Sequence, residues 1–147
     1  MSDIIDLVVQ DHREVEQLFD QLQATEDAAK RAELFSQIRG ELERHATAEE
    51  RVLYPRVKKD VPDGKKESKD ATEEHDEIRA SLKEVEEHDP ASDLFVLAVA
   101  QLIATTKHHV GVEEEELLPD FRANSDTSER DELGRQFEEE KGKVKTT

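Results

Sequence analysis

Cysteine and tryptophan are absent from this chain of 147 residues, and glycine and proline are scarce, at five and four. Without cysteine the chain can form no disulfide, thiolate zinc site, cysteine-ligated iron–sulfur cluster or thiolate haem. Its longest apolar run, residues 94–100, is far too short to span a bilayer. The chain begins Met-Ser-Asp without a basic-then-apolar leader, so we expect a soluble, cytoplasmic protein.

Acidic residues outnumber basic ones by 38 to 21, which gives a net charge of −17. Such a charge would be repelled by the phosphates of nucleic acids and by anionic membrane surfaces, so we expect neither as a partner. Only 34% of the residues are hydrophobic and 40% are charged, which leaves little apolar material for a core. A bound metal would help such a chain to fold, because binding energy at a site absent from the unfolded state is folding energy.

Four segments carry apolar residues or histidines at steps of three and four, the spacing of one helix face. The stripes begin His12, Val15, Phe19, Leu22; Phe35, Ile38, Leu42, His45; His75, Ile78, Leu82, Val85; and Phe95, Val99, Leu102, Thr106. Turn signals separate them at 25–27, 61–64 and Asp89-Pro90, where Asp89 is the expected cap and Pro90 the first helical residue.

One short pattern occurs twice: a His, a Glu four residues later, and a Pro ten residues after the His. The two copies are His45, Glu49, Pro55 and His109, Glu113, Pro119. A lone His precedes each copy at nearly the same distance, His12 by 33 residues and His75 by 34. Residues four apart share a helix face, so each His–Glu pair can point at one place in space.

The turns fall midway between these residues, near positions 28, 62 and 92, which would bring all six to one level of antiparallel helices. The sequence therefore predicts an all-α, up-down-up-down four-helix bundle over residues 1–120. Pro55 and Pro119 are expected to end or kink their helices. The polar extension 121–147 is compatible with a short helix around 129–140 and a loose lysine-rich tail.

A lone His on an apolar stripe is usually a packed core residue, but six such side chains in one layer without a metal would carry a large desolvation cost. We therefore predict that they are metal ligands: His12, His45, Glu49, His75, His109 and Glu113. Imidazole and carboxylate ligands suit iron, manganese, zinc or cobalt. His88 and His108 are expected at the surface, Glu50 lies off the ligand face, and Glu114 is a weaker alternative to Glu113.

Tyr54, the only tyrosine, stands where the second copy has Leu118. One interpretation is a residue that packs at the helix end, since an ideal helix turns Tyr54 away from His45. The other is a phenol at an open coordination position, brought there by a helix distorted near Pro55.

The ordered set of one His, His-x-x-x-Glu, one His and His-x-x-x-Glu resembles the hemerythrin-like, or HHE cation-binding, family. That resemblance implies two iron ions with an oxo or hydroxo bridge, with Glu49 and Glu113 as bridging carboxylates. It also implies His12 and His45 on one iron and His75 and His109 on the other. In oxygen-carrying hemerythrins the third helix supplies two His ligands, four residues apart. In this chain the third helix has His75, and the positions four residues before and after it are Ala71 and Arg79.

The missing ligand leaves two open positions, which favours a redox protein in stress defence that reacts with hydrogen peroxide, dioxygen or nitric oxide. Such a protein would act as a peroxidase- or catalase-like or nitric-oxide-reactive enzyme, with an unidentified electron donor. The alternative is a protein that binds dioxygen reversibly for storage or sensing. Iron storage and a purely structural metal site are further, less favoured interpretations.

Overall fold

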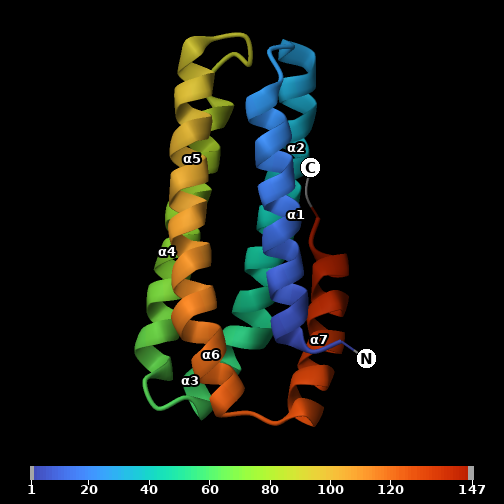
Figure 1. Ribbon diagram of the computed structural model, residues 1–147, viewed down its shortest axis with the longest axis vertical. Coiled ribbons are helices and arrows are strands. Elements are labelled where there is room, and N and C mark those ends of the chain that lie inside the picture. Colours follow the sequence, from blue (N-terminus) through green and yellow to red (C-terminus); the bar gives the residue numbers. More distant parts are fainter. Residues whose placement is uncertain (1, 146–147) are drawn as a thin grey trace.

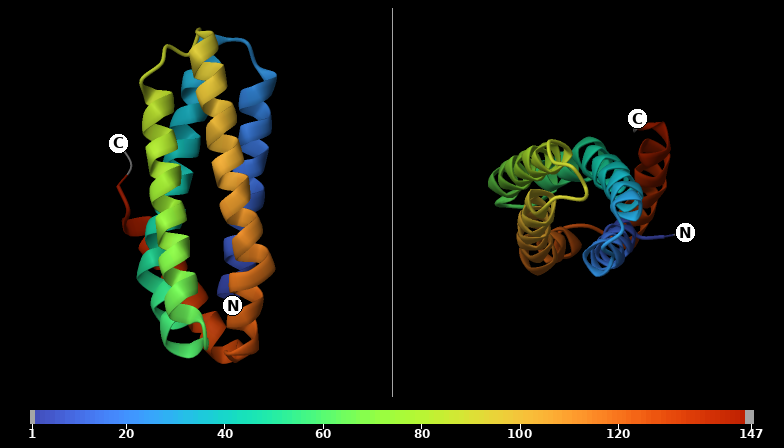
Figure 2. Two further views of the ribbon diagram at one scale, coloured as in Figure 1. Left: turned by 90° about the vertical axis from the view of Figure 1, so that its left-hand side faces the viewer. Right: turned by 90° about the horizontal axis from the view of Figure 1, so that it is seen from above.

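The computed structural model describes residues 2–145, and all the regular elements within that range are helices. Four long helical segments run antiparallel in up-down-up-down order, so the predicted bundle is confirmed (Figures 1 and 2). The first and third are α1 (Ile4–Ala24) and α4 (Gly64–Glu86). The second joins α2 (Ala28–Ala48), η1 (Glu49–Leu53) and α3 (Tyr54–Asp60), and the fourth joins α5 (Asp93–Val112), η2 (Glu113–Leu117) and α6 (Leu118–Ala123).

Side-chain caps mark the start of α1, α2, α5 and the C-terminal helix. The Asp27 carboxylate accepts a hydrogen bond from the backbone N–H of Ala29 at 3.2 Å, at the turn expected over 25–27. At the third turn the expected cap is wrong. Ser92, not Asp89, caps α5, because its hydroxyl accepts from the N–H of Phe95 at 3.2 Å, and Pro90 lies in the turn before the helix.

Pro55 and Pro119 are both expected to end or kink their helices, and neither ends its helical segment. Each lies two residues beyond the last residue of a widened, π-helical turn. Across these turns the backbone N–H of Tyr54 donates to the carbonyl of Glu49, and that of Leu118 to Glu113, five residues back rather than four. Each proline is then the second residue of a new α-helical segment, where it is tolerated.

The buried apolar residues form two clusters, one on each side of the six predicted ligands along the bundle axis. The cluster nearer the N-terminus includes Val8, Tyr54, Ala71, Leu117 and Leu118. The other includes Val15, Leu42, Ile78, Leu82 and Leu102. A polar layer therefore separates two apolar halves, and it lies in the interior of the molecule.

The C-terminal segment forms α7 (Thr127–Lys143), which is longer than the helix considered around 129–140. It packs along α1, α2 and η1 on the outside of the bundle (Figure 1) and buries Leu133 and Phe137. The lysine-rich part expected to be loose is helical as far as Lys143, and its last residues, 146–147, lie outside the described range. Within the described range, no helix is long and apolar enough to cross a membrane.

Candidate metal centre

The structure brings all six predicted ligands together in one buried layer. The histidines come from α1, α2, α4 and α5, and the two glutamates begin the π-helical turns η1 and η2. They form two overlapping groups, in each of which the ligand atoms lie within 4.8 Å of one another. The groups are His12, His45, Glu49, Glu113 and Glu49, His75, His109, Glu113.

Each glutamate lies between the two pairs of histidines. Glu49 Oε1 is 3.0 Å from His45 Nε2 and 3.1 Å from His75 Nε2. Glu113 reaches His12 Nε2 with Oε1 at 3.1 Å and His109 Nε2 with Oε2 at 3.4 Å. Two carboxylates shared by two pairs of imidazoles are the arrangement needed to bridge two cations.

Several fully buried ligand atoms in this layer make no well-oriented hydrogen bond among the described residues. They are His12 Nε2, His45 Nε2, Glu49 Oε2 and Glu113 Oε1, although His12 Nε2 and Glu113 Oε1 lie 3.1 Å apart and His45 Nε2 lies 3.0 Å from Glu49 Oε1. Leaving a buried polar atom unpaired is costly, and native structures rarely do it without a reason. Cations bound between these atoms would satisfy them, so the donor set fits a metal centre of nitrogen and oxygen ligands.

The charges around the layer point the same way. Burial alone would lower the pKa of a histidine, but the neighbouring carboxylates Glu113, Glu74 and Glu49 outweigh it and raise the pKa of His109 to about 10. Burial likewise opposes ionisation of Glu113, yet His109 and His12 hold its pKa well below its usual range. The layer therefore has a strongly negative potential, which favours protonated histidines beside ionised glutamates in the metal-free protein.

A ring of four further carboxylates, hereafter the outer carboxylates, orients the histidines. His12 donates from Nδ1 to Glu114 at 2.7 Å, and His75 donates to Glu50 at 2.7 Å. These acceptors directly follow Glu113 and Glu49 in the chain. A carboxylate on Nδ1 fixes the tautomer that leaves Nε2 free for metal and makes the imidazole a stronger ligand.

The other two histidines have matching partners from the neighbouring helix. His45 donates from Nδ1 to Asp11 at 2.8 Å, and His109 donates to Glu74 at 2.8 Å. Asp11 and Glu74 directly precede His12 and His75 in the chain. These roles were not predicted from the sequence, although the sequence has a matching pattern. An acidic residue stands next to His12, Glu49, His75 and Glu113.

Tyr54 is buried and its phenol points into the centre, because the π-helical turn adds one residue between it and His45. The hydroxyl donates to Glu113 Oε2 at 2.5 Å and lies 3.3 Å from Glu49 Oε1 and 3.1 Å from His75 Nε2. Its ring stacks on that of His75 at 5.3 Å between centroids. Burial and the two glutamates raise the pKa of Tyr54 well above its usual value, so the phenol stays neutral without a cation.

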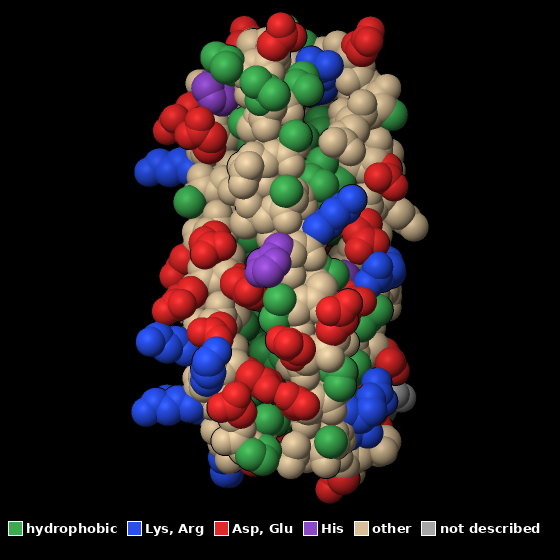
Figure 3. Space-filling model, turned by 60° about the vertical axis from the view of Figure 1, so that its left-hand side comes forward, with side chains coloured by type: hydrophobic (Ala, Val, Ile, Leu, Met, Phe, Trp, Pro, Cys, Tyr) green, Lys and Arg blue, Asp and Glu red, His purple; other side chains and the backbone are tan. Residues whose placement is uncertain are grey.

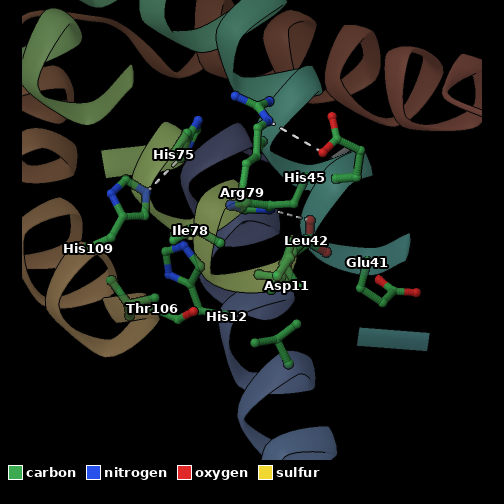
Figure 4. A pocket seen from close by; sticks show the side chains of 15 residues that line it. Asp11, His12, Glu41, Leu42, His45, His75, Ile78, Arg79, Thr106 and His109 are labelled. Atoms are coloured by element: carbon green, nitrogen blue, oxygen red, sulfur yellow. Dashed lines mark hydrogen bonds and ion pairs between the residues drawn. The ribbon is translucent and has the colours of Figure 1, made fainter. Parts of the chain in front are cut away.

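A small cavity of about 30 Å³ lies beside the histidines, and Tyr54 is not among the residues that line it (Figure 4). All four predicted histidine ligands line it. Its apolar walls come from Val15, Leu42, Ile78 and Leu82, and Arg79 and Glu43 lie at its edge. A space of this size holds one or two water-sized molecules.

A wider groove of about 380 Å³ reaches His109 and Glu113 from the outer side, between α4 and η2–α6. Besides Glu113, its walls carry seven acidic residues: Asp63, Glu67, Asp70, Glu74, Glu115, Glu116 and Asp120. Figure 3 shows acidic side chains gathered on the lower part of this face. Partial burial and the nearby Asp120 carboxyl raise the pKa of Glu67 to about 8.

The positions of the missing seventh ligand are occupied by side chains that cannot bind metal. Ala71 is buried in the same apolar cluster as Tyr54. Arg79 donates to the two oxygens of Glu50 at 3.0 and 3.2 Å, and a guanidinium has no free lone pair. His88 and His108 lie away from the layer, and His108 is 69% exposed.

These features define a class of protein: a four-helix bundle whose interior layer carries the donor set of a metal centre, four histidines and two shared glutamates. The family model described as the hemerythrin HHE cation-binding domain matches residues 3–121, and the chain belongs to this family.

Two proteins are similar to this chain over almost its whole length. The chain is 33% identical over 141 residues to a protein of Nostoc sp. named DNA nickase, across 96% of this chain and 40% of that protein. It is 24% identical over 147 residues to an uncharacterized hemerythrin-like protein of Schizosaccharomyces pombe, across 99% of this chain and 72% of that protein. The chain thus spans less than half the length of the first relative. No solved structure matches.

Proposed function

We propose that this protein binds two iron ions and reacts with hydrogen peroxide, dioxygen or nitric oxide in redox or stress defence. The observation that carries the proposal is the small cavity lined by all four histidines, together with the absence of a seventh protein ligand at Ala71 and Arg79. A cavity of about 30 Å³ has room beside the histidines for a diatomic molecule or peroxide. The bound irons would supply the redox electrons.

The protein's own residues prepare the site for such small reactants. Glu49 and Glu113 would hold the ions together with the four histidines, and the outer carboxylates keep each imidazole oriented. The apolar walls at Val15, Leu42 and Ile78 limit the number of waters beside the histidines. Tyr54 keeps its proton in the metal-free protein and donates a hydrogen bond from its hydroxyl to Glu113 Oε2, 2.5 Å away.

Tyr54 also has a second role to test, as a ligand of the ion held by His75 and His109. Its oxygen lies within 3.3 Å of ligand atoms from Glu49, His75 and Glu113. A cation among these atoms would reverse the field that keeps the phenol neutral. An iron-loaded protein with a visible phenolate band that disappears in Tyr54→Phe would support ligation, and an unchanged spectrum would restrict Tyr54 to a hydrogen-bonding role.

The reactivity is tested by loading the protein anaerobically with ferrous iron and adding each reactant in turn. We expect iron oxidation and repeated turnover of peroxide or nitric oxide when a reductant is supplied, and no turnover in His109→Ala. A stable and fully reversible oxygen adduct without turnover would contradict the proposal. It would favour the second candidate, reversible dioxygen binding, which the apolar cavity walls also suit.

The name of the Nostoc relative raises DNA cleavage as a question for this chain. That name belongs to a protein of which the matched region is 40%. The net charge of −17 would repel phosphates, and we propose that this chain has no nucleic-acid partner. Incubation of the iron-loaded protein with supercoiled plasmid checks this: nicking that is lost in His109→Ala would overturn it.

A further inference from the structure

The C-terminal helix α7 lies beyond residues 3–121, which the family model matches, and yet it reaches the metal centre. The ring of Phe137 packs edge-on against the ring of His45, with centroids 5.7 Å apart and planes at 84°. Phe137 is fully buried, so α7 closes the centre on the side of His45.

A charged side chain of α7 adds a second contact. Lys141 Nζ donates to both oxygens of Asp11, at 2.8 and 3.0 Å. Asp11 is the outer carboxylate that accepts from His45 Nδ1 at 2.8 Å. Lys141 also lies over the Phe137 ring, 5.4 Å from its centroid. Hydrogen bonds therefore link Lys141 of α7, through Asp11, to the predicted ligand His45.

The half of the centre formed by His75 and His109 is built differently. Of its two outer carboxylates, Glu50 is paired with Arg79 at 3.0 and 3.2 Å, whereas Glu74, the counterpart of Asp11, has the exposed His108 Nε2 at 3.5 Å. The acidic groove reaches His109 and Glu113 on this side. All four imidazoles are buried, but α7 packs against one half of the centre and the acidic groove reaches the other.

The attachment of α7 to the bundle is specific enough to hold this arrangement. Arg130 is largely buried, and its Nε donates to Asp3 at 2.6 Å. Gly134 lies so close to the N-terminal segment that an added Cβ would come within 2.0 Å of the Ser2 carbonyl oxygen. Near the other end, Arg51 of η1 donates to Glu140 at 3.2 Å.

We propose that α7 contributes to metal binding, because Lys141 positions His45 through Asp11. As a result, the ion held by His12 and His45 leaves more slowly than the ion held by His75 and His109. The inference rests on the metal centre and not on its reactivity. A centre that binds metal but is inert to peroxide would defeat the proposed function and leave this inference intact.

Cobalt(II) offers a test, since its visible absorbance reports its coordination. The cobalt-loaded protein is mixed with excess EDTA, and the loss of absorbance is followed in time. We expect two phases of similar amplitude. Lys141→Met should accelerate the slow phase about fivefold, somewhat less than the ~10-fold or greater effect of losing a carboxylate bonded directly to a ligand. The fast phase should not change.

Two comparisons make the result specific to Lys141. Lys143→Met, on the same helix, removes a half-exposed lysine that pairs only with Glu139 and Glu140 among the described residues, and it should alter neither phase. Lys141→Arg should restore the slow phase, because it keeps the charge facing Asp11. A slow phase unchanged in Lys141→Met, or accelerated equally in Lys143→Met, would overturn the proposal.

A measurement on the unchanged protein guards against a variant that fails to fold. In the zinc-loaded protein, the Nδ1 protons of His45 and His109 can be observed by proton–nitrogen correlation. The His45 proton should exchange with solvent at least tenfold more slowly, because Phe137 packs on the His45 ring and Lys141 holds its acceptor, Asp11, in place. Equal exchange at the two histidines would contradict the asymmetry whatever the variants do.

Discussion

At the scale of single residues, the sequence predicted the six side chains that the structure brings together, because their spacing is fixed by helix geometry and by the turns. It did not predict the outer carboxylates. Glu50 and Glu114 lie off the ligand face of their own helices, and they reach His75 and His12 only because neighbouring helices pack in one register. Contacts between helices depend on that register, which a single helix wheel does not contain.

The ligand assignment makes a direct prediction about metal content. His109→Ala should lose most of the bound metal, because it removes an Nε2 from the ligand group shared with His75, Glu49 and Glu113. His88→Ala should retain it, because His88 pairs only with Glu84, away from the layer. Elemental analysis of the two variants purified side by side checks this. Equal metal in both would remove His109 from the ligand set.

The outer carboxylates make a second prediction. Glu114→Ala should weaken metal binding by about 10- to 100-fold, because His12 loses the acceptor that orients it. Glu115→Ala, at the next position and exposed, is the matched control and should change affinity little. Competition with a chelator of known affinity measures both. If the two variants bind metal equally well, the hydrogen bond from His12 has no part in holding the ion.

At the scale of elements, the four helices and their turns could be predicted, and the two π-helical turns could not. An apolar stripe shows which face of a helix is buried, but not that one turn contains an extra residue. That extra residue turns the Tyr54 side chain toward Glu49 and allows the helical segment to continue past Pro55. The extent of α7 was also underestimated, because its polar sequence has only two buried apolar side chains, Leu133 and Phe137.

The docking of α7 can be tested at its closest approach to the bundle. Gly134→Ala should destabilise the protein, because the new Cβ would meet the Ser2 carbonyl oxygen at 2.0 Å and force α7 outward. At Gly142, in the same helix, an added Cβ would meet no atom within 4 Å. Gly142→Ala should therefore stabilise the protein by about 0.5–1 kcal/mol through helix propensity. Thermal unfolding of both variants compares them. A Gly134→Ala protein as stable as Gly142→Ala would show that α7 is not tightly docked.

At the scale of the whole molecule, acidic charge dominates, and the acidic groove concentrates it beside the metal centre. The raised pKa of Glu67, about 8, means that the folded protein binds a proton there that the unfolded chain releases above about pH 4.5. Stability contributed by that proton is present at low pH and declines as pH rises from about 4.5 to 8. The charge that favours cations therefore lowers stability at neutral pH.

Glu67→Gln tests this dependence. At pH 8 the variant should unfold at a higher temperature than the unchanged protein, by about 2–4 °C if the screened penalty is about 1 kcal/mol. At pH 4.5 the two should be alike, because Glu67 is then protonated. Thermal unfolding of metal-free protein at the two pH values measures the difference. A gain at pH 4.5 equal to that at pH 8 would mean that Glu67 does not carry the proton.

The central claim is that one buried layer binds two cations between four histidines and two shared glutamates. The most direct test is to load the metal-free protein anaerobically with ferrous iron, remove the excess, and count iron per chain together with the visible spectrum after oxidation. The account predicts two irons per chain and the charge-transfer absorbance of a bridged pair. A single iron per chain, or none, would contradict it.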